Sequence, residues 1–225
     1  GGGISIRNNA EPTFFNVTIT GNSVSTNSGG GVFLRDVPSA VFTNSILWNN
    51  SPQEIFFHWA GSSSSITVTY SDVQGGEEGI VTNDNGTVNW LDGNIDSNPL
   101  FTDAANGDYH LSDYSPAIGA GTVTGAPTTD ITGVPNSRPM PSGSNPDMGA
   151  YENSLASVAV APSGTGTADD PYQIANLNNL YWVTQNNSTW ESYFEQTASL
   201  DASSTSQWDG NSGFPTIGNA SVPFT

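Results

Sequence analysis

Acidic side chains dominate the chemistry that this sequence could perform. The chain has 21 Asp and Glu residues against 3 Arg and no Lys, and its formal net charge is −18. Paired carboxylates about 5 to 9.5 Å apart are the catalytic groups of glycoside hydrolases. Stacked coils could bring Asp72 or Asp84 near Glu77 and Glu78 of the GGEEG turn. Turns of this composition are usually solvated, so we expect no catalytic residues here.

The other candidate groups lack the partners that catalysis requires. Polysaccharide lyases need a base beside a charge-neutralising group, often Lys or Arg, and this chain has no Lys. His58 and His110 lie far apart in the sequence, without metal-ligand spacing. We expect His110 to be buried or bonded to the backbone. His58 belongs to the aromatic run EIFFHWAG, which fits an inward strand at least as well as an exposed binding patch.

Calcium is the one cofactor that the acid content favours, because it binds carboxylate and carbonyl oxygens. None of the loop acids has EF-hand spacing, and solvated acids are the commoner alternative. The candidates are Asp92, Asp96, Asp103, Asp108, Asp169 and Asp170. The same negative charge disfavours nucleic acid as a partner, and no segment approaches the roughly 20 apolar residues of a transmembrane helix.

A 28-residue repeat supplies the framework that would position these groups. GGGISIRNN begins at Gly1 and GGGVFLRDV begins at Gly29. A weaker third copy at the same spacing places Asp72 on Asn44, and a fourth step places Phe101 on Val73. A constant period with alternating apolar residues predicts a solenoid of short parallel strands. The fold class is therefore all-β, a parallel β-helix (solenoid).

Stacked coils place equivalent side chains in ladders about 4.8 Å apart. We expect a structural ladder of Asn16, Asn44 and Asp72, because Asn tolerates left-handed backbone angles at bends. Arg7 should stack over Arg35 on an outer face. A solvated pair is the commoner arrangement, and a binding site for a sugar acid is the alternative.

Four motifs follow the repeats in order: NIDSNPLF from Asn94, GDYHLSDYSPAIGAG from Gly107, DITGVPNSRP from Asp130 and DMGAYE from Asp147. This set resembles the choice-of-anchor Q class of bacterial surface β-helix proteins. The resemblance covers roughly residues 1–152 and implies a secreted or cell-surface right-handed β-helix, usually without assigned catalytic residues. Gly119 stands where that class usually has Asp.

We interpret residues 98–152 as a cap segment that folds over the last coil, since an uncovered coil exposes unpaired strand edges. Arg138 lies between Asp130 and Asp147 in the sequence. We expect it to pair with a carboxylate and fasten the cap segment. The proposed cap residues are Arg138, Asp130, Asp147 and Glu152.

A second module follows a linker at residues 153–167. The segment GTGTADDPYQIANLNNLYWVTQNN from Gly164 and its continuation resemble the opening of a GLUG-type β-solenoid. Leu177, Leu180, Tyr181 and Thr184 have the spacing of one short amphipathic helix. Nearby aromatic residues should pack structurally rather than bind sugars: Trp182, Trp190 and Trp208. The predicted domains are therefore residues 1–152 and 168–225.

These observations predict a non-enzymatic extracellular or cell-surface protein with a structural or adhesin role. The chain has no cysteine, so its order must come from packing and hydrogen bonds. Expected partners are other copies, other surface proteins or carbohydrate, with neither nucleic acid nor membrane insertion. The alternatives are a polysaccharide-binding or polysaccharide-degrading β-helix and a self-assembling fibre.

Overall fold

The computed structural model describes residues 1–25, 29–37, 39–134, 137–207 and 213–217. The chain forms two compact units, unit 1 at Gly1–Ser154 and unit 2 at Leu155–Thr225. The boundary falls inside the region expected as a linker. Part of that region belongs to unit 2, because Ser163 forms a β-bridge with Gln173. The expected packing residue Trp208 lies outside the described residues.

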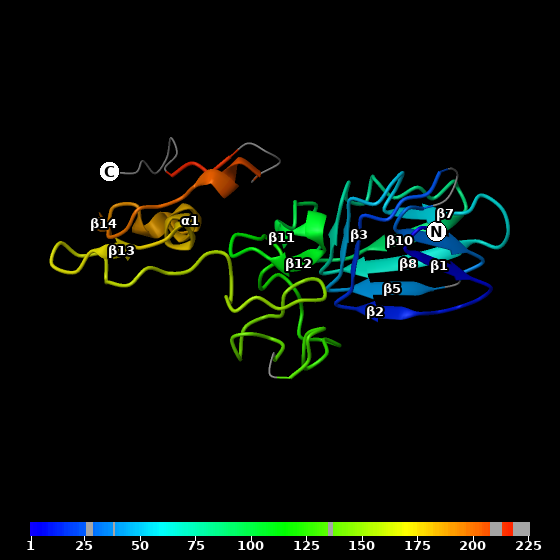
Figure 1. Cartoon of the computed structure of the whole chain (residues 1–225), viewed down its shortest axis with the longest axis horizontal. Helices are drawn as coiled ribbons and strands as arrows, with labels where there is room; N and C mark the ends of the chain where they lie inside the picture. The colour runs from blue at the N-terminus through cyan, green and yellow to red at the C-terminus, as the bar shows by residue number, and fades with distance from the viewer. Residues whose placement is uncertain (26–28, 38, 135–136, 208–212, 218–225) are drawn as a thin grey trace. The chain divides into compact units, whose positions relative to one another are not determined.

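Unit 1 is a parallel β-solenoid in which successive coils add strands to three sheets (Figure 1). All pairs within these sheets are parallel. The first sheet contains β1 (Ile4–Arg7), β4 (Val32–Arg35) and β7 (Ile55–Phe57). The second contains β2 (Thr13–Phe15), β5 (Ala40–Thr43), β8 (Ser64–Thr69) and β10 (Gly86–Trp90). The third contains β3 (Thr18–Thr20), β6 (Ile46–Trp48) and β9 (Asp72–Val73).

The coil length is not constant, which corrects the expected 28-residue period beyond the second coil. Thr18 pairs with Ile46 at the expected spacing, whereas Ile46 pairs with Asp72, which comes two positions too early for that spacing. The next step shortens again, because Asp72 bridges to Ile95. Phe101 does not stack on Val73 but pairs antiparallel with Leu111. Turns absorb these changes of length while the paired strands stay in register.

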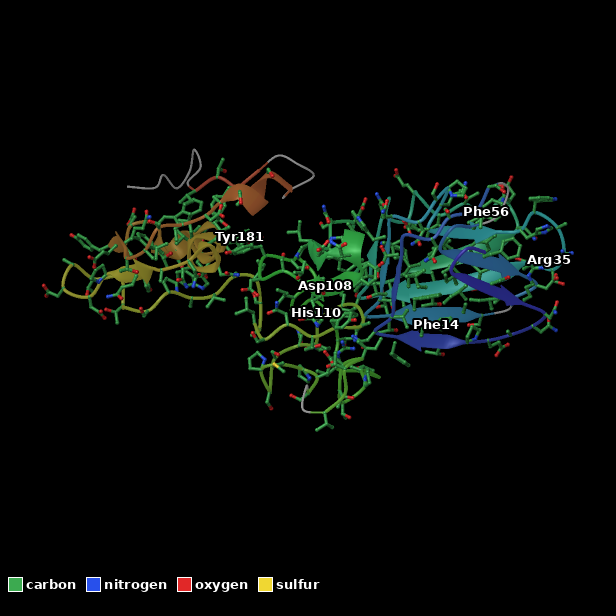
Figure 2. All side chains as sticks on the ribbon, viewed as in Figure 1. Phe14, Arg35, Phe56, Asp108, His110 and Tyr181 are labelled. Carbon is green, nitrogen blue, oxygen red and sulfur yellow. The ribbon has the colours of Figure 1, made fainter. Side chains whose placement is uncertain are left out.

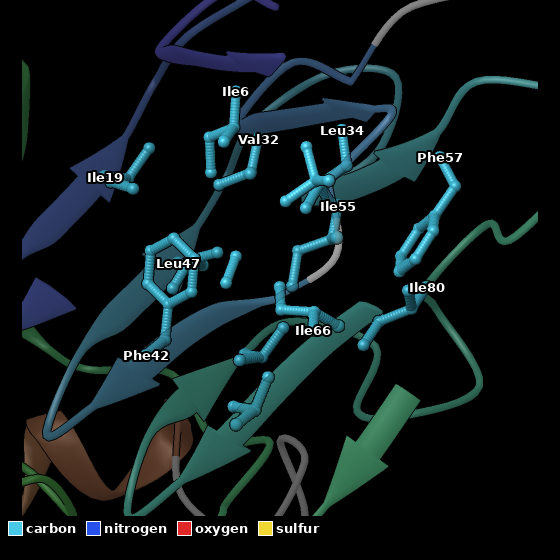
Figure 3. Close-up of a cluster of buried hydrophobic side chains, with 14 residues drawn as sticks. Ile6, Ile19, Val32, Leu34, Phe42, Leu47, Ile55, Phe57, Ile66 and Ile80 are labelled. Atoms are coloured by element: carbon cyan, nitrogen blue, oxygen red, sulfur yellow. The ribbon is translucent and has the colours of Figure 1, made fainter. Parts of the chain in front are cut away.

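Alternate strand residues point inward and build one apolar core (Figure 3). Val32 and Leu34 of β4 are fully buried, as are Ile66 and Val68 of β8. Phe14 stacks on Phe42 one coil away, with ring centroids 4.6 Å apart. Each fully buried aliphatic or Phe side chain contributes about 1.5–3 kcal/mol, so this interior stabilises the coils without disulfides.

A bend with left-handed backbone angles recurs once per coil between the second and third sheets. Asn16 and Asn44 have φ angles of 50° and 52°, and the next positions are Tyr70 at 47° and Gly93 at 79°. The Nδ2 of Asn44 donates to the Oδ1 of Asn16 at 3.3 Å. The expectation that Asp72 is the third member is wrong, because the coil is two residues shorter. Asp72 lies in β9 and pairs with Ile46 of β6.

Unit 2 contains one α-helix between two parallel strands in its described residues. Strand β13 (Tyr172–Ile174) pairs with β14 (Phe194–Gln196), and α1 (Leu177–Gln185) and η2 (Asn187–Thr189) lie between them in sequence. Asn176 caps α1 through its side chain. Trp190 is buried with Ile174 and Val183, and its indole donates to the Val183 carbonyl at 2.7 Å.

The last helix or strand in the described part of unit 2 is η3 (Ser203–Gln207). Trp182 contacts Tyr172 edge to face at 5.5 Å, so Trp182 and Trp190 both pack within the unit. None of the helices in the described ranges is long and apolar enough to cross a membrane.

Asp72 is fully buried in β9 and only partly satisfied. Its Oδ1 accepts a hydrogen bond from the Ser97 N–H at 3.1 Å, but its Oδ2 has no hydrogen-bond partner. Burial raises the pKa of Asp72 well above its usual value, and the nearby charges of Asp96 and Glu54 raise it further. When the pKa of an acid is higher in the folded than in the unfolded protein, the free energy of unfolding falls as the pH rises from the unfolded pKa to the folded pKa.

Replacing Asp72 with Asn should therefore stabilise unit 1 at alkaline pH. Each unit of pKa elevation that the substitution removes is worth about 1.4 kcal/mol, and the Asn amide oxygen can keep the Ser97 bond. Denaturant unfolding of the full chain at pH 5 and pH 9 measures the effect, with the exposed Asp84→Asn as control. Equal stabilisation at both pH values would contradict a charge-burial cost at Asp72.

Candidate functional site

The cap segment packs along the side of the coils, which corrects the expectation that it folds over the last coil. It begins with an antiparallel pair, β11 (Phe101–Asp103) and β12 (Asp108–Leu111), joined through η1 (Ala104–Asn106). Further on, the cap segment reaches the stacked left-handed bends of the first two coils, at Asn16 and Asn44, which we call the bend column. The Nδ2 of Asn16 donates to the Asp147 carbonyl at 2.8 Å, and that of Asn44 donates to the Thr122 carbonyl at 2.7 Å.

The Asn side chains that define the bend column therefore also anchor the cap segment. The Oδ1 of Asn44 accepts the Thr122 N–H at 2.8 Å, and the Asn44 carbonyl accepts the Gly149 N–H at 2.7 Å. The Thr18 hydroxyl accepts the Ala150 N–H at 3.0 Å. Because these bonds satisfy both backbone and side chain, the two Asn residues join coil to coil and coil to cap segment.

A buried ion pair holds the cap segment together behind this contact. The Nε of Arg138 donates to the Oε2 of Glu152 at 2.7 Å, and both side chains are almost completely buried, at 1% and 0% exposure. The Nη2 of Arg138 donates to the Gly149 carbonyl at 3.1 Å. The structure thus gives Arg138 a buried carboxylate partner, as the sequence predicts, and identifies that partner as Glu152.

Three carboxylates surround the single guanidinium, and each accepts backbone N–H groups. Glu152 accepts the Met140 N–H at 3.0 Å. Asp147 accepts the N–H of Gly119 at 2.8 Å and that of Asn153 at 2.6 Å. The Oδ2 of Asp130 accepts the Glu152 N–H at 3.3 Å. These bonds join residues 119, 130, 140 and 153, so the acids organise chain that forms no regular structure there.

The excess of carboxylates over cations shifts the pKa values of the cluster. Burial raises the pKa of Asp147 to about 7, and the charge of Glu152 adds to the rise despite the N–H bonds. Burial also raises the pKa of Glu152. Burial alone would raise the pKa of Asp130, but hydrogen bonds from Thr132 and Glu152 and the charge of Arg138 lower it on balance.

A shallow cleft of about 470 Å³ lies where the cap segment meets the first coil. Asp130 and Arg138 reach its wall, together with Asn16, Val17, Thr18, Pro127, Thr129, Ile131 and Ala150. Asp147 is fully buried and does not line the cleft. Asp147, whose pKa is near neutral, therefore does not contact a substrate in this cleft. The geometry fits a role in holding the cap segment in place.

The other candidate residues from the sequence lie apart from this cluster. His110 was expected to be buried or bonded to the backbone, but it is exposed and its ring Nδ1 lies 2.6 Å from the side-chain Oδ1 of Asp108, with the ring against Tyr151. The hydrogen bond from the His110 imidazole, followed by that from the His110 backbone N–H, lowers the pKa of Asp108. His58 is half-buried and its ring meets Phe33 edge to face. Glu77 and Glu78 lie in a hydrogen-bonded turn closed by Gly79 and Gly75.

The calcium candidates do not come together in the residues that the structure describes. No group of three or more His, Asp or Glu side chains there is arranged to hold a metal ion. Two of the candidates instead make local bonds, since Asp96 accepts the Gly75 N–H and Asp103 caps η1.

One buried acid was not singled out from the sequence. Glu54 accepts the Asn50 N–H at 2.8 Å and also bonds the Asn50 amide, whose Nδ2 donates to the Ile19 carbonyl one coil below. Burial raises the pKa of Glu54. The sequence does place Asn22 and Asn50 at equivalent repeat positions, which indicates an Asn ladder beside Glu54. In the structure the Asn22 Nδ2 donates to the Asn50 Oδ1 at 2.9 Å.

Removing the cation of the cap cluster should unfold the cap segment at modest denaturant concentration. Arg138→Leu leaves the buried Glu152 carboxylate without its cation, which costs about 3–5 kcal/mol. The matched control Arg35→Leu removes an exposed Arg whose pairing with Asp36 at 3.5 Å is worth at most about 1 kcal/mol. Chemical denaturation compares the two variants, and equal small losses would show that the buried pair does not support the fold.

The raised pKa of Asp147 predicts that the cap segment is more stable in mild acid than in mild alkali. The contribution is fully present below the ordinary pKa near 4 and is lost as pH rises through the folded value of about 7. The loss between pH 5 and pH 8 is on the order of 2–3 kcal/mol. Asp147→Asn should weaken this dependence even though it loses one N–H acceptor. Hydrogen exchange at Gly119 and Asn153 measures it, and faster exchange at pH 5 after correction for the intrinsic rates would refute it.

Comparison with known proteins agrees with the coil geometry. The family model described as right handed beta helix region matches residues 1–120. Over 58 residues the chain is 38% identical to a protein named halomucin from Haloquadratum walsbyi, a match that covers 25% of this chain and 1% of halomucin. No solved structure matches. With parallel coils, an apolar interior and a family match over more than half its length, the chain belongs to the right-handed β-helix family.

Proposed function

We propose that the protein is a non-enzymatic structural part of a long extracellular or cell-surface protein, where it provides reach and display. The observation that carries the proposal is the cap cluster, in which Arg138, Glu152 and Asp147 use their hydrogen bonds to fasten chain segments. The cluster holds the irregular cap segment in one arrangement against the coils, which suits a part whose role is reach and display. The net charge of −18 keeps such a surface hydrated and soluble.

The family match and the similarity to halomucin support a surface structural role. The matched segment spans about 1% of halomucin, so the activity and partners of the whole protein belong to this proposal. We further propose that residues 1–152 form a choice-of-anchor Q type module. The parallel pairing of β13 with β14, which sets Tyr172 beside Phe194, supports a GLUG-type solenoid beginning in unit 2.

Labelling of intact cells tests the location. An antibody raised against the cap segment should bind cells of the producing organism without permeabilisation, and brief treatment of the cells with a non-specific protease should remove the signal. An antibody against a cytoplasmic protein is the control. Labelling that requires permeabilisation would contradict the surface role.

An assay for cleavage tests the structural role against the enzyme alternative. The full chain should release no new reducing ends and no unsaturated sugars from acidic or neutral polysaccharides, with or without added calcium. Product that depends on the chain, and that survives repurification, would overturn the non-enzymatic proposal.

A further inference from the structure

Basic and aromatic side chains form two adjacent columns on the outer face of the first sheet. Arg7 pairs in register with Arg35, and the His58 N–H donates to the Leu34 carbonyl at 2.8 Å, which places His58 next after Arg35. The neighbouring column contains Ser5, Phe33 and Phe56. Alternate residues of a strand share one face, so both columns point away from the core. Figure 2 labels Arg35 and Phe56 on this part of unit 1.

The rings of these columns form a continuous platform. Phe33 stacks on Phe56 with centroids 6.2 Å apart and meets the His58 ring edge to face at 5.8 Å. His58 stacks on Trp59 at 4.3 Å. Phe33 and Phe56 are buried, but Trp59 is 54% exposed. The Trp59 indole thus stacks on His58 with one face and remains about half exposed above a packed aromatic base.

The two guanidinium groups beside the platform are poorly neutralised. The guanidinium carbon of Arg7 lies 4.7 Å from the Phe33 ring centroid, and its Nε donates to the Ser5 hydroxyl at 2.9 Å. Within the described ranges no carboxylate forms an ion pair with Arg7, and Arg35 has only a 3.5 Å contact with Asp36. The chain has seven acids for each Arg, yet two of its three Arg residues occupy paired positions on β1 and β4. Like charges at paired positions repel each other, and a bound anion would relieve this repulsion.

The loop that carries Trp59 is fixed on both sides. The Asp36 carboxylate accepts the Ser62 N–H at 2.5 Å, and the Asn85 amide donates to the His58 carbonyl at 2.8 Å. The His58 Nδ1 also lies 2.8 Å from the Ala60 carbonyl. A loop ordered before binding loses little entropy when a ligand arrives, so the exposed indole is already held in place.

We propose that Arg7, Arg35, His58 and Trp59 form a binding site for an acidic saccharide, with the guanidinium groups holding its carboxylate and the Trp59 ring packing on its sugar face. Guanidinium groups match carboxylates in shape and charge, and an aromatic ring supplies an apolar surface for the C–H face of a sugar. This binding role goes beyond the structural role proposed above and does not depend on it.

Titration of the full chain with matched oligosaccharides tests the site. The probes are an oligomer of β-1,4-linked glucuronic acid, the neutral glucose oligomer of the same linkage and length, and polyglutamate as a polyanion without sugar. In about 0.15 M salt, where distant charges are screened, the acidic oligomer should bind and the other two should bind at least tenfold more weakly. Equal binding of polyglutamate or of the neutral oligomer would overturn the proposal.

Two variants and their controls assign the binding to these residues. Arg7→Gln with Arg35→Gln should lower affinity for the acidic oligomer about tenfold or more, whereas Val123→Glu with Val134→Glu changes the net charge equally at exposed positions elsewhere in unit 1 and should leave it within twofold. Trp59→Ala should lower affinity about fivefold, and the exposed Tyr193→Ala should not. Circular dichroism verifies that each variant is folded. Folded Arg and Trp variants that retain full affinity, or equal losses in the controls, would overturn the site.

Discussion

In-register pairing between coils is the constraint on which the rest of unit 1 depends. Each coil places its strands directly on those of its neighbour, so a side chain's position follows from its register and not from its distance along the chain. The apolar interior, the bend column of Asn16 and Asn44, and the outer columns with Arg7 and Arg35 are all consequences of this pairing. The turns that lead from the third sheet to the first, such as β3–β4 and β6–β7, change length because they carry none of these contacts.

The cap segment covers the side of the coils on which Asn16 and Asn44 lie in register. Its irregular chain has few backbone partners of its own, and buried carboxylates provide them by accepting N–H groups from four places. Three acids around Arg138 are more than one cation can neutralise, so the arrangement is tightest when Asp147 holds a proton. A buried ionic cluster of this kind specifies one arrangement of the chain more than it adds stability.

The sequence predicted the fold and much of the cap cluster but not the later coils. GGG followed by alternating apolar residues repeats clearly between the first two coils, and there the 28-residue spacing holds. The third coil is shorter and replaces the bend Asn with Tyr70, a residue that gives no signal for a left-handed angle. A constant spacing therefore predicts the wrong column for Asp72. The side-on position of the cap segment also escaped prediction, because its bonds to Asn16 and Asn44 join positions far apart in the sequence.

Register in a shortened coil can be measured directly because the chain contains no cysteine. Thr67 and Asn89 lie side by side on β8 and β10, with the Asn89 amide 3.3 Å from the Thr67 hydroxyl. A Thr67→Cys, Asn89→Cys double variant should oxidise to an intramolecular disulfide, since paired Cα atoms about 5 Å apart permit one. Thr67→Cys with Ile95→Cys, at the constant spacing of the first two coils, should stay reduced. The opposite pattern would contradict in-register stacking of unequal coils.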